Sequence, residues 1–280
     1  MNKPSIKIVT LDLDGTLLNS EKQVTARTID VLKKCEQQGI QIVPATGRAR
    51  HAVPEEILSL PGVRYAIFTN GASIWDIKEG REIGAACIDW ETARETAEIL
   101  RRYPIIYDMY IDGIGVCERH FLEHLESFGL SGVLCRFIRQ TRKTVEDIRA
   151  YLEETHSAVQ KLNLTFRMDM EDKAVKAAVR TELEQLPGLL VTSSLPWNLE
   201  LNAAGATKGS GLTRLSRYLG LELAETMACG DGENDLSMIL AAGVGVCMGN
   251  GAPFVKPQAD WIAPSNDEDG VAAAIEHWAL

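Results

Sequence analysis

Hydrophobic residues near the start of the chain alternate between strand-like and helix-like segments. The apolar, β-branched run Ile6–Leu13 indicates a buried strand. Apolar residues then recur at helical spacing between Thr25, which suits an N-cap, and Gly39, which suits a helix end. Two more strand-like segments follow, at Ile40–Ala45 and Ala66–Thr69. Strands and helices that alternate in this way predict parallel β-α-β units.

The last third of the chain repeats this alternation. The predicted elements are, in order, a helix, a strand, a helix, two strands and a helix: Thr207–Leu219, Thr226–Cys229, Asn234–Ala242, Val244–Met248, Ala259–Ile262 and Gly270–Leu280. Glycines punctuate the turns between them. The two ends of the chain therefore predict one α/β core with a parallel sheet.

The middle of the chain has a different pattern. Asp112-Gly113 joins two strand-like runs, which indicates a hairpin. The predicted strands and helices of this region are Ile105–Ile111, Ile114–Cys117, Val159–Phe166, Glu91–Arg102, Val145–Glu154 and Asp172–Leu186. This α+β composition predicts an inserted domain over residues 86–190, with residues 1–85 and 191–280 forming the core.

Composition and charge narrow the classes of function. The chain has 280 residues, enough for two modest domains, and its formal net charge is −10. An acidic chain of this kind argues against nucleic acid as the main partner, but a local positive site can still bind a small anion. We see no signal peptide and no apolar run of about 18 residues, so we expect a cytoplasmic protein with no membrane partner. The six scattered cysteines favour free thiols in a reducing compartment, and we expect a monomer or small homo-oligomer.

Polar residues cluster where the predicted core strands end. The clusters are Asp12 with Asp14, Thr46-Gly47-Arg48, Asn70-Gly71, and Asp231-Gly232-Glu233-Asn234-Asp235. In open parallel sheets, ligands bind outside the carboxyl ends of the strands. We therefore expect these clusters to meet in one crevice.

The acidic residues of this crevice predict a magnesium site. Asp12, Asp14 and Asp231 would repel one another without a cation, and Mg²⁺ prefers oxygen ligands of this kind. No His or Cys accompanies them, so zinc is disfavoured. Asp12 would attack phosphorus and form an aspartyl-phosphate, while Asp14 would act as the general acid and base.

Other residues suit phosphate binding. Lys208 begins a predicted helix and could neutralise a carboxylate and a phosphoryl oxygen, the Thr46-Gly47 amides could cradle phosphate, and Asn234 could donate through its side-chain amide. Arg48 could line this site or face solvent. Strand-end Asp residues also occur in plain turns and helix caps. The ordered combination with Lys208 favours the chemical interpretation over the structural one.

The same residues carry a resemblance to a known family. Asp12-Leu13-Asp14-Gly15-Thr16-Leu17-Leu18 resembles the first motif of the haloacid dehalogenase-like (HAD) superfamily, and Thr46, Lys208 and Gly230–Asp235 resemble the second, third and fourth. Asn70-Gly71-Ala72, Met248-Gly249-Asn250 and Ser265–Val271 resemble the Cof-like branch, subfamily IIB, which has a C2B cap. The resemblance implies a doubly wound Rossmann-like α/β core with a parallel sheet, plus an inserted α+β cap. The long stretch between Asn70 and Lys208 has room for that cap, whereas the stretch between Asp14 and Thr46 does not.

The resemblance also implies a role for each matching residue. Asp12 would be the nucleophile, and Asp12, Asp231 and the backbone carbonyl of Asp14 would bind Mg²⁺. Asp235 would support the metal site without binding the metal directly. Phosphate would be held by Leu13, Thr46, Gly47, Lys208 and Asn234, and the substrate could also contact Arg48, Asn70 and Gly71.

These observations predict a Mg²⁺-dependent phosphatase that acts on a small phosphorylated metabolite, either a sugar phosphate or a phosphorylated cofactor. Two alternatives remain open. One is a phosphotransferase of the sugar-phosphomutase type, which would use the same nucleophile. The other is a non-catalytic protein that binds a phosphorylated metabolite. The identity of the leaving group, which the cap is expected to recognise, does not follow from the residues.

Overall fold

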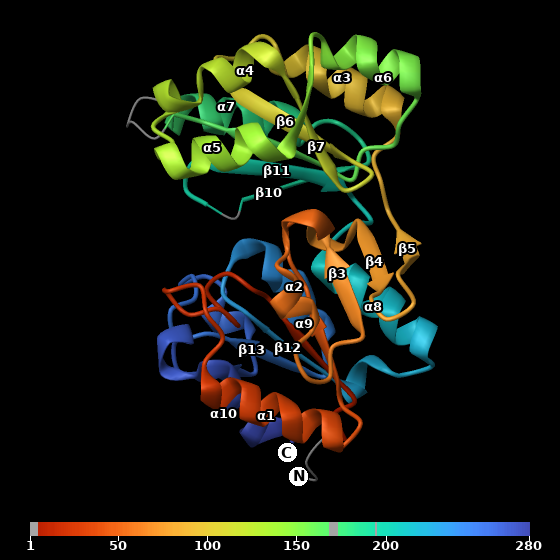
Figure 1. The fold of residues 1–280 in the computed structure, drawn as a ribbon, viewed down its shortest axis with the longest axis vertical. Coiled ribbons are helices and arrows are strands. Elements are labelled where there is room, and N and C mark those ends of the chain that lie inside the picture. Colours follow the sequence, from red (N-terminus) through yellow and green to blue (C-terminus); the bar gives the residue numbers. More distant parts are fainter. Residues whose placement is uncertain (1–4, 168–172, 194) are drawn as a thin grey trace. The chain divides into compact units, whose positions relative to one another are not determined.

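The chain folds into two compact units (Figure 1). The computed structural model describes residues 5–167, 173–193 and 195–280. The first unit combines Met1–Ala85 with Ala206–Leu280, and the second is Ala86–Gly205. The second boundary differs from the predicted break after residue 190. Strand β11 (Asn198–Ala203) pairs along its length with a strand of the second unit, so the residues leading up to it belong there as well.

The first unit holds a parallel sheet and a small antiparallel one. Its strands are β1 (Ile8–Leu11), β2 (Gln41–Pro44), β3 (Tyr65–Phe68), β4 (Ser73–Asp76), β5 (Arg81–Ala85), β12 (Thr226–Gly230), β13 (Val244–Cys247) and β14 (Trp261–Ile262). Its helices are α1 (Ala26–Gln37), α2 (Glu55–Leu58), α8 (Lys208–Leu219), α9 (Leu236–Ala241) and α10 (Gly270–Trp278). The parallel sheet has the order β14-β13-β12-β1-β2.

Helices cover both faces of this sheet, which gives the doubly wound arrangement predicted from the sequence. Val9 and Leu11 of β1 pack with buried residues of α1 and α10, whereas Ile8 packs with residues of α8 and α9. Successive strand residues point to opposite faces, so a strand buried on both sides is apolar at most positions, and in β1 only Thr10 is polar. Thr25 is the N-cap of helix α1, and its hydroxyl accepts the backbone N–H of Thr28.

Strand β3 departs from the expected arrangement. It pairs antiparallel with β4 in a separate three-stranded sheet, although single parallel bridges, such as that between Ala45 and Ile67, keep it beside β2. Its carboxyl end still lies next to that of β2, because Thr46 donates its backbone N–H to Ile67.

The second unit is built on a six-stranded sheet of order β10-β11-β9-β6-β7-β8, in which only the pairing of β7 with β8 is parallel. Its other strands are β6 (Ile106–Ile111), β7 (Ile114–Glu118), β8 (Arg142–Val145), β9 (Lys161–Thr165) and β10 (Leu189–Thr192). Its helices are α3 (Trp90–Leu100), α4 (Arg119–Glu123), α5 (Gly132–Thr141), α6 (Ile148–Thr155) and α7 (Lys173–Leu183). The predicted helix start at Asp172 lies outside the described residues.

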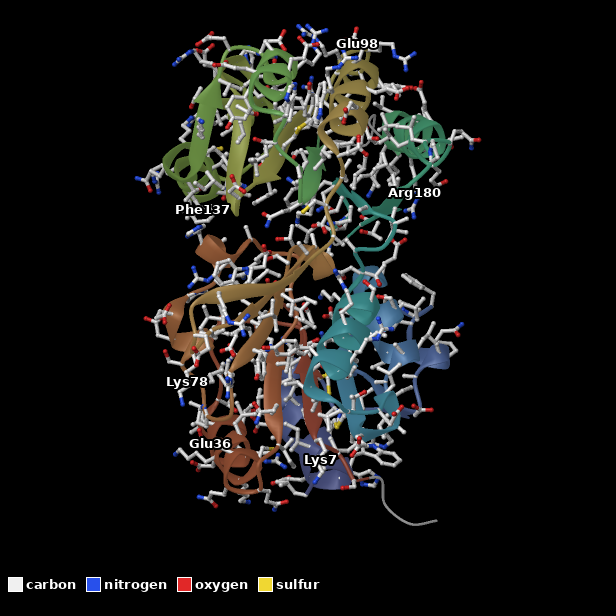
Figure 2. All side chains as sticks on the ribbon, turned by 90° about the vertical axis from the view of Figure 1, so that its right-hand side faces the viewer. Lys7, Glu36, Lys78, Glu98, Phe137 and Arg180 are labelled. Atoms are coloured by element: carbon white, nitrogen blue, oxygen red, sulfur yellow. The ribbon has the colours of Figure 1, made fainter. Side chains whose placement is uncertain are left out.

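The two faces of this second sheet differ in chemistry. One face packs its apolar residues against α3, α6 and α7. The other combines an apolar part, covered by α4 and α5, with a network of charged residues and amides. Figure 2 shows Glu36 and Lys78 pointing outward from the first unit and Glu98 from the second, in contrast to the buried charges described below.

Candidate active site

Strand register brings the predicted site residues of the first unit to one edge. Leu11 of β1 lies beside Pro44 of β2 and Cys229 of β12, so all three strands end together. Asp12 and Asp231 follow two of these strands directly. The structure therefore places both carboxylates at the carboxyl edge of the sheet, where parallel sheets bind ligands.

Lys208 lies at the centre of the site. Its side chain is fully buried, and its Nζ atom donates to Asp12 Oδ1 and to Asp235 Oδ1, each at 2.5 Å. The lysine is the first residue of α8, which Thr207 caps with its hydroxyl. This cap sets where the helix begins, and so directs the lysine into the site.

The loop after β12 is held by Asp235. Its Oδ2 atom accepts the backbone N–H groups of Asp231, at 2.9 Å, and Gly232, at 2.8 Å. Asp231 in turn accepts the hydroxyl of Thr16 at Oδ1, at 3.1 Å. Asp235 therefore supports this loop and orients Lys208.

Burial and like charge make this cluster electrostatically unbalanced. Burial, together with repulsion from Asp235, raises the pKa of Asp12 well above its usual value, despite the attraction of Lys208. The same two causes raise the pKa of Asp231 to about 6. Burial opposes the charge of Lys208, but the attraction of Asp12 and Asp235 outweighs it and raises the pKa of the lysine.

This cluster fits a hard divalent cation. One carboxylate oxygen from each of Asp12, Asp231 and Asp235 lies within 4.8 Å of the others. Asp235 already accepts from Lys208 and two backbone amides, so Asp12 and Asp231 are the carboxylates better placed to bind a metal. Mg²⁺ typically binds one or two protein carboxylates and completes its shell with water and phosphate.

Asp14 is paired with two cations. Arg48 contacts it bidentately, at 2.7 Å from Nη2 and 2.9 Å from Nε, and Lys22 Nζ lies 2.8 Å from its Oδ1 atom. Burial alone would raise the pKa of Asp14, but the hydrogen bonds from Arg48 and Lys22 outweigh burial and lower it. The sequence predicted a general acid and base at Asp14, and the structure pairs this carboxylate with two cations that favour its ionised form. Arg48 therefore faces the site rather than solvent.

The remaining predicted residues line the same edge. Thr46 is buried, and its hydroxyl accepts the backbone N–H of Arg48 at 3.1 Å. Asn234 donates its amide to the buried Asn70 at 3.1 Å. Gly71 has a φ of +95°, and a Cβ atom there would lie 2.1 Å from the carbonyl oxygen of Thr207, so only glycine permits this close approach to the start of α8.

The backbone at positions 13 and 47 also belongs to this edge. Leu13 lies between the two acids of the first motif with its side chain fully buried in the core, and Gly47 follows Thr46 directly. Two further contacts were not foreseen from the sequence. Thr16 stood in the quoted motif without a role, and nothing local to Lys22 indicates that its side chain reaches Asp14.

The fold and site thus define a doubly wound α/β protein with an acidic, lysine-bearing site at the carboxyl edge of its sheet and an inserted second unit. The chain belongs to the haloacid dehalogenase-like hydrolase family, whose model matches residues 9–275. The family resemblance found in the sequence is therefore confirmed.

Several relatives of this chain are named as phosphatases. A 5-amino-6-(5-phospho-D-ribitylamino)uracil phosphatase of Bacillus subtilis is 31% identical, with 98% of this chain and 96% of the relative aligned. A pyridoxal phosphate phosphatase of Escherichia coli is 28% identical over 96% and 97% of the two chains. A solved structure of a HAD-superfamily phosphatase from Bacteroides thetaiotaomicron has a TM-score of 0.79 at 31% identity, covering 98% of this chain and 95% of that one.

These matches confirm the predicted enzyme class, a phosphoric monoester hydrolase of the HAD type. They also confirm the α/β core, and the separate, mainly antiparallel sheet of the second unit suits a cap domain. Within the part of the chain that the structure describes, no helix is long and apolar enough to cross a membrane.

Proposed function

We propose that this protein is a Mg²⁺-dependent phosphatase that hydrolyses a small phosphorylated metabolite through an aspartyl-phosphate on Asp12. The observation that carries the proposal is the buried Asp12 carboxylate, held at 2.5 Å by Lys208 beside the second carboxylate of Asp231. A nucleophile needs a fixed position, and a phosphate dianion needs cations around it.

In the first half-reaction, an oxygen of the Asp12 carboxylate attacks phosphorus. The bond between phosphorus and the leaving-group oxygen breaks, and that oxygen takes a proton from Asp14. Asp14 must first part from Arg48 and Lys22 and acquire this proton, because both cations favour its ionised form. In the second half-reaction, Asp14 accepts a proton from water, which attacks phosphorus, releases inorganic phosphate and regenerates Asp12.

Surrounding groups hold the phosphate during both steps. The Lys208 ammonium, the Thr46 hydroxyl, the amides of Leu13 and Gly47 and the side chain of Asn234 are the donors proposed for its oxygens. Mg²⁺, held by Asp12, Asp231 and the backbone carbonyl of Asp14, would supply positive charge beside the transferring group. Such electrostatic stabilisation is usually the largest contribution to phosphoryl transfer.

A phosphorylated cofactor or a sugar phosphate is the proposed substrate. Two relatives support this range, since one is named for a ribityl phosphate of a uracil derivative and the other for pyridoxal phosphate. Both leaving groups are polar.

The test is a phosphate-release screen over several dozen phosphorylated metabolites, with and without Mg²⁺. We expect at least one substrate to be hydrolysed only with the metal, and Asp12→Asn to lower its turnover by at least roughly 10³-fold. Asp30→Asn is the matched control, because Asp30 is an exposed aspartate paired only with Lys33 in the described structure. Equal rates for wild type and Asp12→Asn would exclude the mechanism.

The same screen separates the alternatives. A phosphotransferase would release little phosphate and would need a bisphosphate activator to move phosphate between positions of a sugar. A non-catalytic binding protein would bind a metabolite without turning over any member of the panel with Mg²⁺.

A further inference from the structure

Two motifs in the last part of the chain have no role in the proposed catalytic mechanism. They are Met248-Gly249-Asn250 and the segment Ser265–Val271. Both lie in the first unit, and an asparagine of each reaches the loop that carries Asp12 and Asp14. The Asn250 amide donates to the carbonyl oxygen of Gly15 at 2.8 Å, and the Asn266 amide donates to that of Leu18 at 2.9 Å.

These asparagines form a connected clasp, defined here as Asn250 and Asn266. The backbone N–H of Asn266 donates to Asn250 Oδ1 at 3.0 Å, so the backbone of Asn266 orients the Asn250 side chain. The loop is also tied further along. Asp267 accepts the backbone N–H and hydroxyl of Ser20, at 2.8 and 2.7 Å.

The clasp acts on a backbone that needs restraint. Gly15 has a φ of +85°, and a Cβ atom there would lie 2.6 Å from Asp231 Oδ2, so the position requires glycine. Glycine also has the greatest backbone freedom of any residue, and the peptide that follows it can rotate unless something holds its carbonyl. Asn250 holds that carbonyl.

The carbonyl of Leu13, the residue before Asp14, is held as well. Leu13 accepts the backbone N–H of Leu18 at 2.9 Å. The Leu13–Asp14 peptide is therefore held within the loop and the Gly15–Thr16 peptide by Asn250, and these two flank the Asp14–Gly15 peptide, which carries the Asp14 carbonyl. Thr16, which follows Gly15, donates its hydroxyl to Asp231 at 3.1 Å, so the clasp and the acidic cluster act on adjacent residues.

We propose that Asn250, supported by Asn266, is a positioning residue for the metal site. It fixes the peptide after Gly15, and with it the direction of the Asp14 backbone carbonyl and of the Thr16 hydroxyl. This inference rests on the proposed function, because it assigns the clasp to the site where Mg²⁺ is proposed to bind. Residues behind a metal site commonly change its affinity without touching the metal.

The test compares Asn250→Ala with the wild-type protein in two measurements that need no turnover. The first is deuterium exchange of the Leu17 and Leu18 amides in metal-free protein, since these amides donate to Asp12 and Leu13 within the loop. The second is Mg²⁺ binding by calorimetry. We expect faster exchange at both amides and a Kd for Mg²⁺ that rises by about 10- to 100-fold. At saturating Mg²⁺, kcat should recover more than half of its loss, while KM stays within about twofold.

Asp260→Ala is the matched control. Asp260 lies in the same part of the chain and accepts one backbone hydrogen bond, from Gly245 at 2.8 Å, but has no contact of this kind with the loop. It should leave both measurements unchanged. Since Asn250 is exposed, its variant should fold; if it does not, Asn250→Leu, which keeps the side-chain size but removes the donor to the Gly15 carbonyl, serves in its place.

The outcomes separate the clasp from the proposed function. If the Asn250 variant exchanged its amides and bound Mg²⁺ as the wild-type protein does, the proposed role of the clasp would be wrong. The proposed phosphatase function would be unaffected by that result. Equal changes in exchange and Mg²⁺ affinity in Asp260→Ala would also contradict the role of the clasp, because they would indicate a general loss of stability. Failure of the wild-type protein itself to bind Mg²⁺ would refute the metal site of the proposed function and the clasp's assignment together.

Discussion

The two units each bury charged residues, but they balance them differently. In the first unit, the acids Asp12, Asp231 and Asp235 surround a single buried cation, Lys208. In the second, the sheet face carries two buried ion pairs. Asp108 contacts Arg142 at 2.5 Å and Lys161 contacts Glu200 at 3.3 Å, with side chains that are at most 9% exposed.

This difference distinguishes a site from a structural network. In these two pairs of the second unit, each buried charge has an opposite partner, and neighbouring side chains add hydrogen bonds: Tyr110 accepts from Arg142 and Asn163 donates to Asp108. In the first unit, the surplus of carboxylates raises the pKa of both Asp12 and Asp231. An unbalanced buried cluster is stable only with a further cation or with protons, and so indicates a ligand that the protein alone does not supply.

The largest expected effect comes from removing the one cation of the first cluster. Lys208→Met leaves three neighbouring acids without a counter-charge, and removing one partner of a buried pair costs about 3–5 kcal/mol. We expect the free energy of unfolding of metal-free protein to fall by that amount and turnover to fall by at least about 100-fold. Urea unfolding and phosphate release measure the two effects.

The control is Lys33→Met, which removes an exposed lysine paired with Asp30 and should change neither quantity measurably. If Lys208→Met were as stable as this control, Lys208 would not neutralise the carboxylates of the cluster. The proposed difference between the buried charges of the two units would then be wrong.

A pair of matched substitutions tests the contrast directly. Asp108→Asn removes a charge from a balanced pair and should lower the free energy of unfolding by about 3 kcal/mol, because Arg142 stays buried. Asp12→Asn removes one of three like charges, so we expect unchanged or higher stability in metal-free protein at pH 7.5, despite the loss of turnover. Thermal unfolding of both variants without Mg²⁺ provides the measurement. Equal losses of stability would contradict the distinction between the two clusters.

The smallest effect is a dependence of metal stabilisation on pH. The pKa of Asp231 is about 6 in the folded protein, above its usual value of 3.8, so the folded state binds this proton more tightly than the unfolded state does. The metal-free protein should therefore lose stability as pH rises through this interval. Mg²⁺ competes with the proton, so it should raise Tm by a few degrees more at pH 7.5 than at pH 5.0.

Asp231→Asn provides the comparison, because it removes the titrating group. We expect its Tm to respond to Mg²⁺ weakly and equally at the two pH values. A wild-type response that is the same at pH 5.0 and pH 7.5 would show that proton release from the cluster does not accompany metal binding.

Hydrophobic periodicity was enough to predict the core and its acidic edge. The β1, β2 and β12 strands are short, apolar runs, and an in-register parallel sheet brings the residues that follow them together, whatever their separation in sequence. The asymmetry of the second sheet was harder to foresee. Asn198–Ala203 alternates polar and apolar residues, as a strand does, but its polar positions are satisfied by β9, far away in the chain, so no local window reveals that they are buried.

The ion pairs of Asp14 also could not be predicted from the residues near it in the sequence. Arg48 and Lys22 come from different turns of the first unit, and Lys22 adopts a left-handed backbone conformation with a φ of 62°. Side-chain direction at such positions depends on loop packing, which the pattern of hydrophobic residues does not encode. The sequence therefore identified most of the groups that meet at this edge, but not Lys22, and not which groups contact one another.

The pairing of β1 with β12, which are far apart in the sequence, has a consequence for the order in which the site is synthesised. Asp12 leaves the ribosome early, but its partner Lys208 follows 196 residues later. At ~5–20 residues per second, Asp12 is synthesised roughly 10–40 s before this counter-charge. The second unit is synthesised entirely within that delay and can fold first. A chain whose synthesis stops before α8 therefore lacks Lys208 and the loop after β12, so it cannot assemble the acidic cluster.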